Sequence, residues 1–423
     1  MTAPRPTVPS KAAGQVSEAR LWARHLAMAQ FGATVKGGVN RQALSIEEIA
    51  ARLQLIEWAT GLGLVAFNDD AGNLFLRLEG SEPDLAPVLT GSHIDSQPSG
   101  GRFDGIYGVL AGLEAVQAIL EAGIRPRRSI EVVAWMNEEG SRFAPGMMGS
   151  EAFAGLRPLS TILAVRDAAG AMTGDALAAV LQAEADAVRA TRPLGFAPHA
   201  FLEAHIEQGP VLEAAGIPIG VVTGIQGVRR FRLRVTGTEA HAGTTPRAAR
   251  RDALQAAVRI IAHLDSLTDQ PGVMFTVGMI EVKPNAPSVV PAEAYFSIDL
   301  RHPDDALLQA LGDAVHDRAA GLAAPCRVEV TEIAAARALA FPERLQALIA
   351  GHAGSLGLKH MSLPSLAGHD ARQLHHVCPT AMIFVPCRDG VSHREDEYAS
   401  PEDLAAGCRV LTECLLDLAE ITP

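Results

Sequence analysis

The sequence predicts an α/β fold with a mixed, mostly parallel sheet, into which a smaller βαββαβ unit is inserted. The runs 86–90 and 129–136 are apolar enough to be buried strands, and a helix from about Tyr107 separates them. A strand, a helix and a strand in this order indicate two parallel strands joined by a right-handed crossover. Between about 223 and 334 the pattern changes to the βαββαβ order of a ferredoxin-like unit.

The 423 residues are enough for two domains, because single hydrophobic cores stop growing below this length. We therefore expect a catalytic domain formed by residues 1–222 and 335–423, interrupted by an inserted lid domain at 223–334. Residues 1–16 are expected to form a flexible tail, since this end contains Pro, Ser and Thr and lacks the apolar core of a signal peptide.

The composition argues against several functional classes. Hydrophobic residues make up 48% and charged residues 20% of the chain, an ordinary balance for a globular protein. The net charge of −12 argues against nucleic acid as a partner, and no apolar stretch approaches the length that crosses a membrane. The five cysteines form no Cys-x-x-Cys motif, so we expect reduced thiols in a cytoplasmic protein.

The N-terminal part is expected to contain two helices and a hairpin. Residues 18–31 and 45–62 show helical periodicity, and the second helix opens with a capping box at Ser45. The runs 64–68 and 73–78 are separated by Asp-Asp-Ala-Gly, which is typical of a hairpin. The inserted unit is expected to contain a strand at 228–236, a helix from about 247, strands at 273–282 and 293–300, a helix at 304–322 and a strand at 327–333. In the second part of the catalytic domain we expect a strand at 380–385 and a helix from Pro401.

Polar clusters follow the expected strands at their carboxyl ends, where ligand crevices form in open α/β sheets. The Gly- and Ser-rich loop 91–105 follows the first buried strand and contains His93, Asp95 and Asp104. Taken alone, this loop is equally consistent with a polar turn that caps the next helix.

Glu138 and Glu139 follow the second buried strand. Because adjacent residues point in different directions, one glutamate can bind a metal ion while the other faces a substrate or a water molecule. The alternative is a solvated acidic turn, but the directly preceding apolar strand favours burial at a sheet edge. His205 and His393 accompany two further strands, and in isolation His205 is more consistent with a core histidine.

The polar residues at the strand ends form a set of candidate metal ligands. Imidazole and carboxylate together suit Zn²⁺, Mn²⁺ or a similar ion, and the absence of Cys from the set argues against a closed structural zinc site. There are enough ligands for two ions that share one bridging carboxylate, an arrangement that activates a water molecule. The set consists of His93, Asp104, Glu138, Glu139, His205 and His393.

Seven short segments carry a family resemblance that covers nearly the whole chain after the N-terminal tail. They are Gly91-Ser-His-Ile-Asp-Ser, Gly101-Arg-Phe-Asp-Gly, Asn137-Glu-Glu-Gly-Ser-Arg-Phe, His205-Ile-Glu-Gln-Gly-Pro, Ala240-His-Ala-Gly-Thr-Thr-Pro, Ala367-Gly-His-Asp-Ala and Gly390-Val-Ser-His. Their order and joint presence resemble the dinuclear metal-dependent amidohydrolases of the M20 peptidase superfamily. The chain is most similar to the hydantoinase/carbamoylase branch, which contains N-carbamoyl-L-amino acid hydrolases, β-ureidopropionases and allantoate amidohydrolases.

The resemblance implies two divalent metal ions per subunit, Zn²⁺ or else Mn²⁺, Co²⁺ or Ni²⁺. Asp104 would bridge the two ions, and Asp95 would accept a hydrogen bond from the His93 ring and fix its tautomer. The first ion would be held by His93, Asp104 and His205, and the second by Asp104, Glu139 and His393.

The resemblance also implies that Glu138 is the general base, which takes a proton from the attacking water and returns it to the leaving nitrogen. His241 from the lid would stabilise the oxyanion, and in relatives it can reach the other subunit's site, which implies a homodimer joined through the lid. Arg301 would hold the substrate carboxylate in a bidentate pair. Further positions that line the substrate pocket in relatives correspond to Gln208, Arg230, Gly368 and His369.

The implied substrate is an N-carbamoyl-L-α-amino acid, a small ureido-carboxylate that is cleaved to amino acid, ammonia and carbon dioxide. Relatives with the pattern Asn-x-x-Asn-Val-Val-Pro contact the substrate through an Asn where this chain has Ser288, and Asn285 is the residue that could compensate. The shorter hydroxyl disfavours allantoate, whose two ureido groups need more polar partners. Allantoate amidohydrolase is therefore the second candidate and β-ureidopropionase the third. A metallo-aminopeptidase or an N-acyl amino acid deacylase is less consistent with the Gly-Gly-Arg-Phe-Asp loop and the His205-Ile-Glu-Gln cluster.

Overall fold

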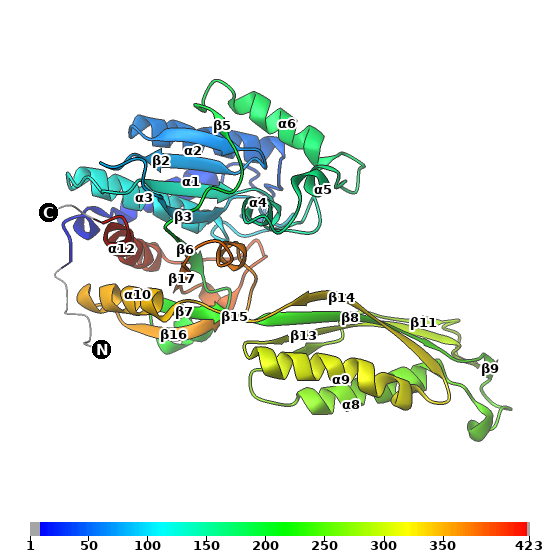
Figure 1. Ribbon diagram of the computed structural model, residues 1–423. Helices are drawn as coiled ribbons and strands as arrows, with labels where there is room; N and C mark the ends of the chain where they lie inside the picture. The colour runs from blue at the N-terminus through cyan, green and yellow to red at the C-terminus, as the bar shows by residue number, and fades with distance from the viewer. Residues whose placement is uncertain (1–8, 421–423) are drawn as a thin grey trace. The chain divides into compact units, whose positions relative to one another are not determined.

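The computed structural model describes residues 9–420, which divide into two compact units (Figure 1). The larger unit contains residues up to Thr223 together with those from Phe341 onward, and the smaller unit is Gly224–Ala340. The expected boundary at 334 is corrected to 340, because the strand β14 (Arg327–Ala336) runs past 334 and a short strand, β15 (Leu339–Ala340), follows it.

Four parallel strands form the centre of the sheet in the larger unit, in the order β4-β3-β6-β17. They are β3 (Val88–His93), β4 (Ile130–Trp135), β6 (Ala200–Ile206) and β17 (Thr380–Val385), and every one of their residues is buried. Continuous burial is what a parallel sheet covered on both faces requires. This arrangement confirms the predicted α/β fold with a mostly parallel central sheet.

The outer strands of this sheet are mainly antiparallel. Strand β2 (Leu74–Leu78) pairs with β4 and forms the predicted hairpin with β1 (Val65–Asp69), whereas β5 (Thr191–Arg192) runs parallel to β1. At the opposite side, β7 (Ile219–Ile225) is antiparallel to β17, and β16 (His360–Ser365) pairs with β7.

The helices of the larger unit pack through two apolar clusters. The main core joins the sheet to α1 (Glu18–Met28), α2 (Ile46–Gly61), α3 (Ile106–Glu121), α10 (Glu343–Ser355) and α12 (Pro401–Leu418). The smaller cluster includes α4 (Met148–Phe153), α5 (Leu159–Leu163) and α6 (Thr173–Glu184), and two short helices, α7 (Val211–Ala215) and α11 (Ala371–Leu374), follow β6 and β16. Helix α3 is buried on nearly all sides, so it crosses between β3 and β4 as a core helix.

The expected flexible tail extends only partly into the described residues, and there the expectation is wrong. Residues 1–8 lie outside the described part of the chain, but Ala12, Ala13 and Val16 are buried beside the first 3-10 turn (Ala13–Gln15). Ser10 also donates hydrogen bonds from its backbone N–H and its hydroxyl to Glu413 at 2.9 and 2.6 Å. Small apolar side chains at the start of the chain therefore complete the core instead of fraying.

The smaller unit is an antiparallel sheet with its strands in the order β10-β13-β8-β14, with β11 also paired to β13. It contains β8 (Gly227–Thr236), β10 (Met274–Thr276), β11 (Ile280–Lys283), β13 (Glu293–His302), β14, α8 (Ala253–Thr268) and α9 (Asp305–Ala323). The strand expected at 273–282 is split into β10 and β11, but the connectivity is that of a split βαβ unit. Both helices pack on one face of the sheet, and alternate residues of β8 and β13 point into that core.

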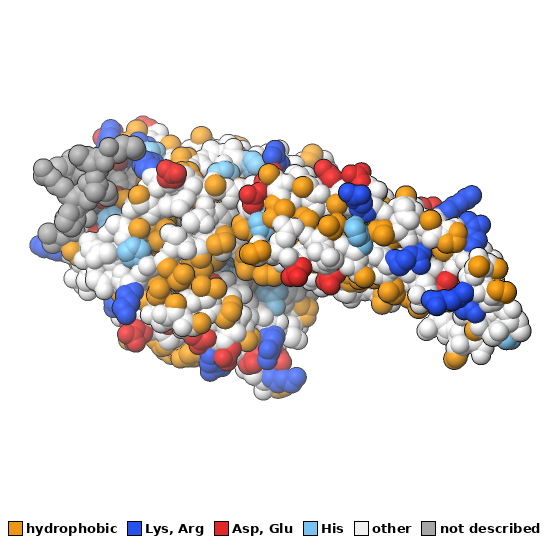
Figure 2. All heavy atoms as spheres, turned by 90° about the horizontal axis from the view of Figure 1, so that it is seen from below, with side chains coloured by type: hydrophobic (Ala, Val, Ile, Leu, Met, Phe, Trp, Pro, Cys, Tyr) orange, Lys and Arg blue, Asp and Glu red, His pale blue; other side chains and the backbone are white. Residues whose placement is uncertain are grey.

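The surface carries charges of both signs. On the face shown in Figure 2, basic and acidic side chains are interspersed among apolar ones. Within residues 9–420, no helix combines the length and the apolar composition that crossing a membrane requires.

Candidate metal and catalytic site

The predicted site residues of the larger unit meet where the central strands end. His93 is the last residue of β3, Glu138 and Glu139 follow β4, His205 lies near the end of β6, and His393 follows β17. Because β3, β4, β6 and β17 are parallel neighbours, their carboxyl ends share one edge of the sheet (Figure 1). Residues far apart in the sequence are thereby brought together.

A first group of candidate ligands consists of His93, Asp104 and His205, which are all buried. One nitrogen or oxygen atom from each lies within 4.8 Å of the others. Asp104 Oδ1 is 3.2 Å from His205 Nε2 and 3.9 Å from His93 Nε2.

A second group consists of Asp104, Glu139 and His393. His393 Nε2 lies 3.1 Å from Asp104 Oδ2 and 3.4 Å from Glu139 Oε2. The two carboxylate oxygens of Asp104 thus face different groups, Oδ1 the first and Oδ2 the second. A shared carboxylate of this kind can bridge two cations.

The backbone orients both buried imidazoles. His93 Nδ1 lies 2.9 Å from the carbonyl oxygen of Asp95, and His205 Nδ1 lies 2.8 Å from the carbonyl oxygen of Ile206. A carbonyl can only accept, so each Nδ1 carries a proton, and each Nε2, which faces the ligand group, is the nitrogen that a cation would take in place of a proton. The first group therefore has the tautomers that cation binding needs.

The predicted contact of the Asp95 carboxylate with the His93 ring is accompanied by a shorter one. The Asp95 oxygen at hydrogen-bond distance from that ring belongs to its backbone, whereas Oδ1 is 3.5 Å away. The carboxylate also accepts the backbone N–H groups of Glu138 at 3.2 Å and Glu139 at 3.1 Å. Asp95 therefore fixes the turn after β4, because its carboxylate binds the backbone of both glutamates.

The turn after β4 separates the two glutamates. Asn137 has φ +54°, a left-handed conformation that Asn tolerates, and its side-chain amide donates to the carbonyl of Phe143 at 2.8 Å. Glu139 belongs to the second ligand group, whereas Glu138 belongs to neither of these groups and its Oε2 is 3.5 Å from His93 Nε2. Glu138 thus lies beside the ligands with its carboxylate available for another task.

Buried carboxylates dominate the electrostatics. Burial raises the pKa of Glu138 well above its ordinary value, and the charges of Asp370, Glu139 and Asp95 raise it further against the opposing His93. Burial, followed by the charge of Asp104, raises the pKa of Glu139 to about 7.

Protons on the histidines compensate part of this negative charge. Burial alone would raise the pKa of Asp104, but hydrogen bonds from His205 and His393 and the charges of His205 and His93 hold it well below its ordinary value. The hydrogen bond to Asp104 and the nearby Glu139 raise the pKa of His393 to about 9. An excess of buried carboxylates together with imidazoles favours a bound cation, and this donor set fits Zn²⁺, Mn²⁺, Co²⁺ or Ni²⁺.

Three predicted pocket residues of the larger unit surround this cluster. The Gln208 side-chain amide donates to Asp104 Oδ2 at 3.0 Å, so Gln208 contacts a candidate ligand directly. His369 is buried, with its ring centroid 4.5 Å from that of His205 and Nε2 2.9 Å from Ser365 Oγ. At Gly368 a Cβ atom would come within 2.6 Å of Met147 Cε, so the glycine allows the Met147 side chain to approach.

Several residues of the site were not predicted. Gln97 Nε2 donates to Glu139 Oε2 at 2.7 Å, Ser392 Oγ lies 3.1 Å from Asp104 Oδ2, and Glu397 binds the backbone of the loop that carries Asp104. Gln97 lies within the predicted loop and Ser392 directly precedes His393, so closeness in sequence to predicted ligands could have identified both residues. Glu397 ends an Arg-Glu-Asp-Glu run that is indistinguishable from a solvated turn by composition.

The other predicted residues belong to the smaller unit. His241 is exposed on β9 (Ala240–His241), and its Nδ1 accepts the backbone N–H groups of Gly243 at 2.9 Å and Thr244 at 3.2 Å. Strand β9 pairs with β12 (Val289–Val290), and the backbone N–H of Ala242 donates to the carbonyl of Ser288 at 3.0 Å. Asn285 is exposed in the same loop with φ +56°.

Arg301 and Arg230 share one carboxylate of the smaller unit. Arg301 Nε and Nη2 donate to the two oxygens of Asp299 at 2.8 and 3.2 Å, and Arg230 Nε donates to Asp299 Oδ2 at 2.8 Å. Hydrogen bonds and charge from the two guanidinium groups outweigh the effect of burial and lower the pKa of Asp299. Both predicted pocket arginines therefore lie on one face of the sheet and are held by the same anion.

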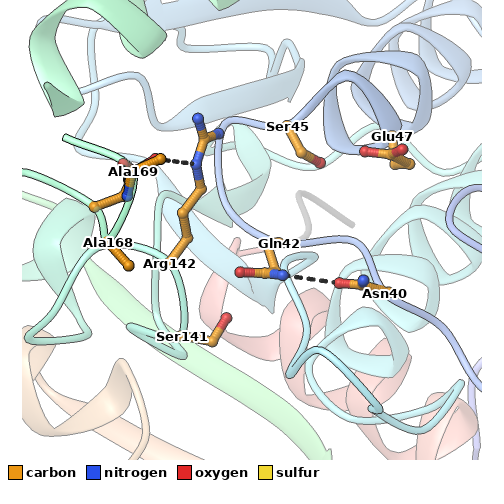
Figure 3. A pocket seen from close by; sticks show the side chains of 9 residues that line it. Asn40, Gln42, Ser45, Glu47, Ser141, Arg142, Ala168 and Ala169 are labelled. Carbon is orange, nitrogen blue, oxygen red and sulfur yellow. Dashed lines mark hydrogen bonds and ion pairs between the residues drawn. The ribbon is translucent and has the colours of Figure 1, made fainter. Parts of the chain in front are cut away.

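Two cavities of the larger unit lie near the strand ends. One of about 360 Å³ is lined by Ser141, Arg142 and residues of the 40–47 and 167–169 segments, and there Arg142 Nε donates to Asp167 at 3.1 Å (Figure 3). It borders the turn after Glu139 without including a predicted site residue. A second cavity of about 310 Å³ is lined by His393, Lys36 and the 394–396 segment, so it reaches the second ligand group from outside.

Comparisons with known proteins agree with this geometry. Residues 89–417 match the family model described as Peptidase family M20/M25/M40. An N-carbamoyl-L-amino-acid amidohydrolase from Rhizobium meliloti is 40% identical over 413 residues, which cover 96% of this chain and 98% of that protein. An allantoate amidohydrolase from Bacillus subtilis (strain 168) is 36% identical over 407 residues, covering 93% and 95%. The crystal structure of a hydantoinase/carbamoylase family amidase from Burkholderia multivorans is 44% identical, with a TM-score of 0.89, and covers 96% of this chain and 98% of that one.

Proposed function

Because the chain belongs to peptidase family M20/M25/M40, as its seven segments predicted, we propose that it is a two-metal N-carbamoyl-L-amino acid amidohydrolase. It would cleave the carbamoyl C–N bond of an N-carbamoyl-L-α-amino acid, so that one water and one substrate give amino acid, ammonia and carbon dioxide. The observation that carries this proposal is Asp104, whose two oxygens face separate groups of imidazole and carboxylate ligands beside the free carboxylate of Glu138. The amidohydrolase from Rhizobium meliloti supports the substrate class.

Two divalent ions would be held by His93, Asp104 and His205 and by Asp104, Glu139 and His393. Such ions supply Lewis acidity toward a carbonyl oxygen and toward a water molecule. Glu138 would accept the proton of the attacking water and deliver it to the leaving nitrogen, since its carboxylate lies 3.5 Å from His93 of the first group without belonging to either group. Asp95 would keep the two glutamates apart through its bonds to their backbone N–H groups.

The smaller unit would act as a lid and as the dimerisation surface of a homodimer. In this role His241 would donate to the oxygen that becomes negative in the transition state, through the Nε2 that its own loop leaves free. Arg301 would bind the substrate carboxylate through the N–H groups not used by Asp299. The remaining pocket residues would be Arg230, Asn285, Ser288, Gln208, Gly368 and His369.

A cytoplasmic location fits the thiols of the chain. Cys326, Cys378, Cys387, Cys408 and Cys414 are all free and buried. Burial raises the pKa of Cys387 to about 12 and that of Cys378 to about 11, so these thiols are poor nucleophiles and serve as core residues.

Allantoate is the second candidate substrate, since the relative from Bacillus subtilis carries that name. Ser288 argues against it, because a hydroxyl is shorter than an asparagine amide and offers one donor where the amide offers two. An allantoate-hydrolysing enzyme would need Asn285 to replace that contact.

A substrate panel with defined metals tests the proposal. Metal-depleted protein is reconstituted with Zn²⁺, Mn²⁺, Co²⁺ or Ni²⁺, and ammonia release is measured with N-carbamoyl-L-amino acids, their D-enantiomers, N-carbamoyl-β-alanine and allantoate. N-acetyl amino acids and dipeptides, assayed for free amine, represent the deacylase and aminopeptidase alternatives. We expect the highest kcat/KM with N-carbamoyl-L-amino acids; a higher value with allantoate or with a peptide would overturn the substrate assignment.

A further inference from the structure

Glu397 is a buried carboxylate with no task in the proposed reaction. It is 1% exposed, and it follows His393 by four residues on the loop after β17. Its Oε1 accepts the backbone N–H groups of Phe103 at 2.9 Å and Asp104 at 3.0 Å, and its Oε2 accepts the hydroxyl of Ser392 at 2.8 Å. A carboxylate that accepts several such bonds is firmly fixed.

The loop that carries Asp104 is shaped around this carboxylate. A Cβ atom at Gly101 would collide with the carboxylate and the Cβ of Glu397. Gly101 has no positive φ, so a glycine is needed there for space and not for backbone conformation. The Gly-Gly-Arg-Phe-Asp segment thus provides both the two bonded N–H groups and the room for their acceptor.

A second path connects Glu397 to the Asp104 side chain. Ser392 Oγ lies between the carboxylates, 2.8 Å from Glu397 Oε2 and 3.1 Å from Asp104 Oδ2, and it also accepts from Gln208 Nε2 at 3.1 Å. Glu397 therefore fixes the Asp104 backbone directly, and the Ser392 hydroxyl, which can donate to one carboxylate at a time, lies between the two side chains.

We propose that Glu397 is a positioning residue that sets the orientation of Asp104, and thereby the geometry of both ligand groups. The inference rests on the proposed function in that Asp104 is taken to bridge two ions. Glu397 acts through Asp104 and not as a ligand, because both of its oxygens are already occupied by N–H and O–H donors. Rotation of Asp104 would weaken both groups together, since its two oxygens serve one group each.

Metal binding by the purified, metal-depleted protein tests this role. Binding of Zn²⁺ and of Mn²⁺ is titrated calorimetrically for the parent and for Glu397→Ala and Gly101→Ala, which displace the carboxylate by independent routes. We expect the dissociation constants of both variants to rise about 10- to 100-fold, the effect typical of residues that orient metal ligands. Glu397→Gln, which keeps one acceptor oxygen for the backbone N–H groups, should recover part of the affinity.

Asp396→Asn is the matched control. It makes the same charge change one residue away, but Asp396 is exposed and pairs with Arg394 at 2.8 Å. Its metal affinity should equal that of the parent. Thermal melting followed by circular dichroism shows whether each variant is folded at the titration temperature. If Glu397→Ala does not fold, Ser392→Ala tests the proposal in its place. It removes one hydrogen bond to Glu397, and its metal affinity should fall between about 2- and 10-fold.

Two results would overturn the proposal. Folded Glu397→Ala with parental affinity and stoichiometry would show that Asp104 is oriented without Glu397. Loss of affinity for one ion alone would contradict an effect through the shared carboxylate. A parent that binds two ions but hydrolyses no ureido substrate would refute the proposed function and leave this inference standing.

Discussion

The two units of this chain hold their chemically active side chains in opposite ways. In the larger unit His93, Asp104 and His205 are buried and lie close together beyond the strand ends, with Asp104 Oδ1 3.2 Å from His205 Nε2 and 3.9 Å from His93 Nε2. In the smaller unit His241 is exposed and Arg301 is neutralised by its neighbour Asp299. The first cluster is held by the protein interior, whereas the second consists of groups at the surface.

The two units also differ in net charge. The smaller unit contains 13 Lys and Arg against 13 Asp and Glu, whereas the larger one contains 23 against 35 and so carries the whole net charge of −12. Buried carboxylates of the larger unit account for part of that excess. The candidate cation ligands thus lie in the larger unit, and under the proposed function substrate recognition and transition-state contacts would be the tasks of the smaller one.

The largest effect is expected from Glu138→Gln. Removing only the proton acceptor should lower kcat by about 10²- to 10⁴-fold while both ions stay bound. Steady-state kinetics and elemental analysis of the purified variant provide the measurement. An empty metal site in this variant would show that Glu138 binds metal, as Glu139 is proposed to do, and would refute its role as the general base.

The next largest effect should come from the smaller unit. His241→Ala is expected to lower kcat by about 10²- to 10³-fold with little change in KM, because an oxyanion donor acts on charge that exists only in the transition state. Metal content should not change. Mixed dimers with Glu138→Gln should recover activity if the histidine acts across the dimer, and verified heterodimers without recovery would refute that arrangement.

Arg301→Lys tests whether the smaller unit recognises the substrate carboxylate. Lysine cannot reproduce the planar fork, so kcat/KM for N-carbamoyl-L-amino acids should fall on the order of 10- to 100-fold, the scale of one lost charge-assisted bond. The neutral carbamoyl amino acid amide should be affected much less. Arg318→Lys, an exposed change on α9, is the matched control. Equal losses for acid and amide would show that Arg301 has a structural task only.

A smaller effect is expected from Arg250→Ala, which loosens the loop that carries His241. Arg250 Nε donates to the carbonyl of Thr245 at 2.9 Å and Nη2 to that of Ala242 at 2.6 Å. We expect kcat to fall about 10-fold, the equivalent of roughly 1.4 kcal/mol of lost ordering, with metal affinity unchanged. Arg251→Ala removes bonds to Pro325 on the neighbouring segment and should leave kcat near the parent value. Equal effects of the two changes would refute a specific role of Arg250.

Metal removal should distinguish the units without any substitution. A ligand present at 100 times its dissociation constant stabilises the folded state by about 2.7 kcal/mol. Hydrogen exchange should therefore slow on metal addition in the 91–105, 137–140 and 390–397 loops and stay constant in the 224–340 unit. Equal slowing in both units would contradict a site confined to the larger one.

Much of the site was predictable because it lies where parallel strands end. His93, Asp104, Glu139, His205 and His393 all follow or end apolar runs, and the βαβ order places those ends at one edge. The direction of a side chain beyond a strand end is not determined by periodicity, so the bonds of the Asp95 carboxylate to the backbone of Glu138 and Glu139 were not predicted.

Burial of charge was the main quantity that the sequence did not reveal. Glu397 lies in an acidic run typical of solvent, yet it is buried because the distant Phe103–Asp104 backbone supplies donors for it. The same reasoning applies near the N-terminus, where Ala12 and Val16 join an apolar core that includes residues of α12, far away in the sequence. Such partners become visible only when the tertiary structure is known.

Strand β17 lies between β6 and β7, parallel to the first and antiparallel to the second. During synthesis on the ribosome, β6 and β7 are made long before residues 380–385. Until β17 is added, the edges of β6 and β7 that will pair with it have no partner strand. Exposed edges of apolar strands are templates for association with other chains. The second ligand group is also incomplete until β17 is in place, because His393 follows this strand. The last tenth of the chain therefore closes the sheet and completes the second ligand group in a single step, and truncations before residue 380 should yield aggregation-prone protein.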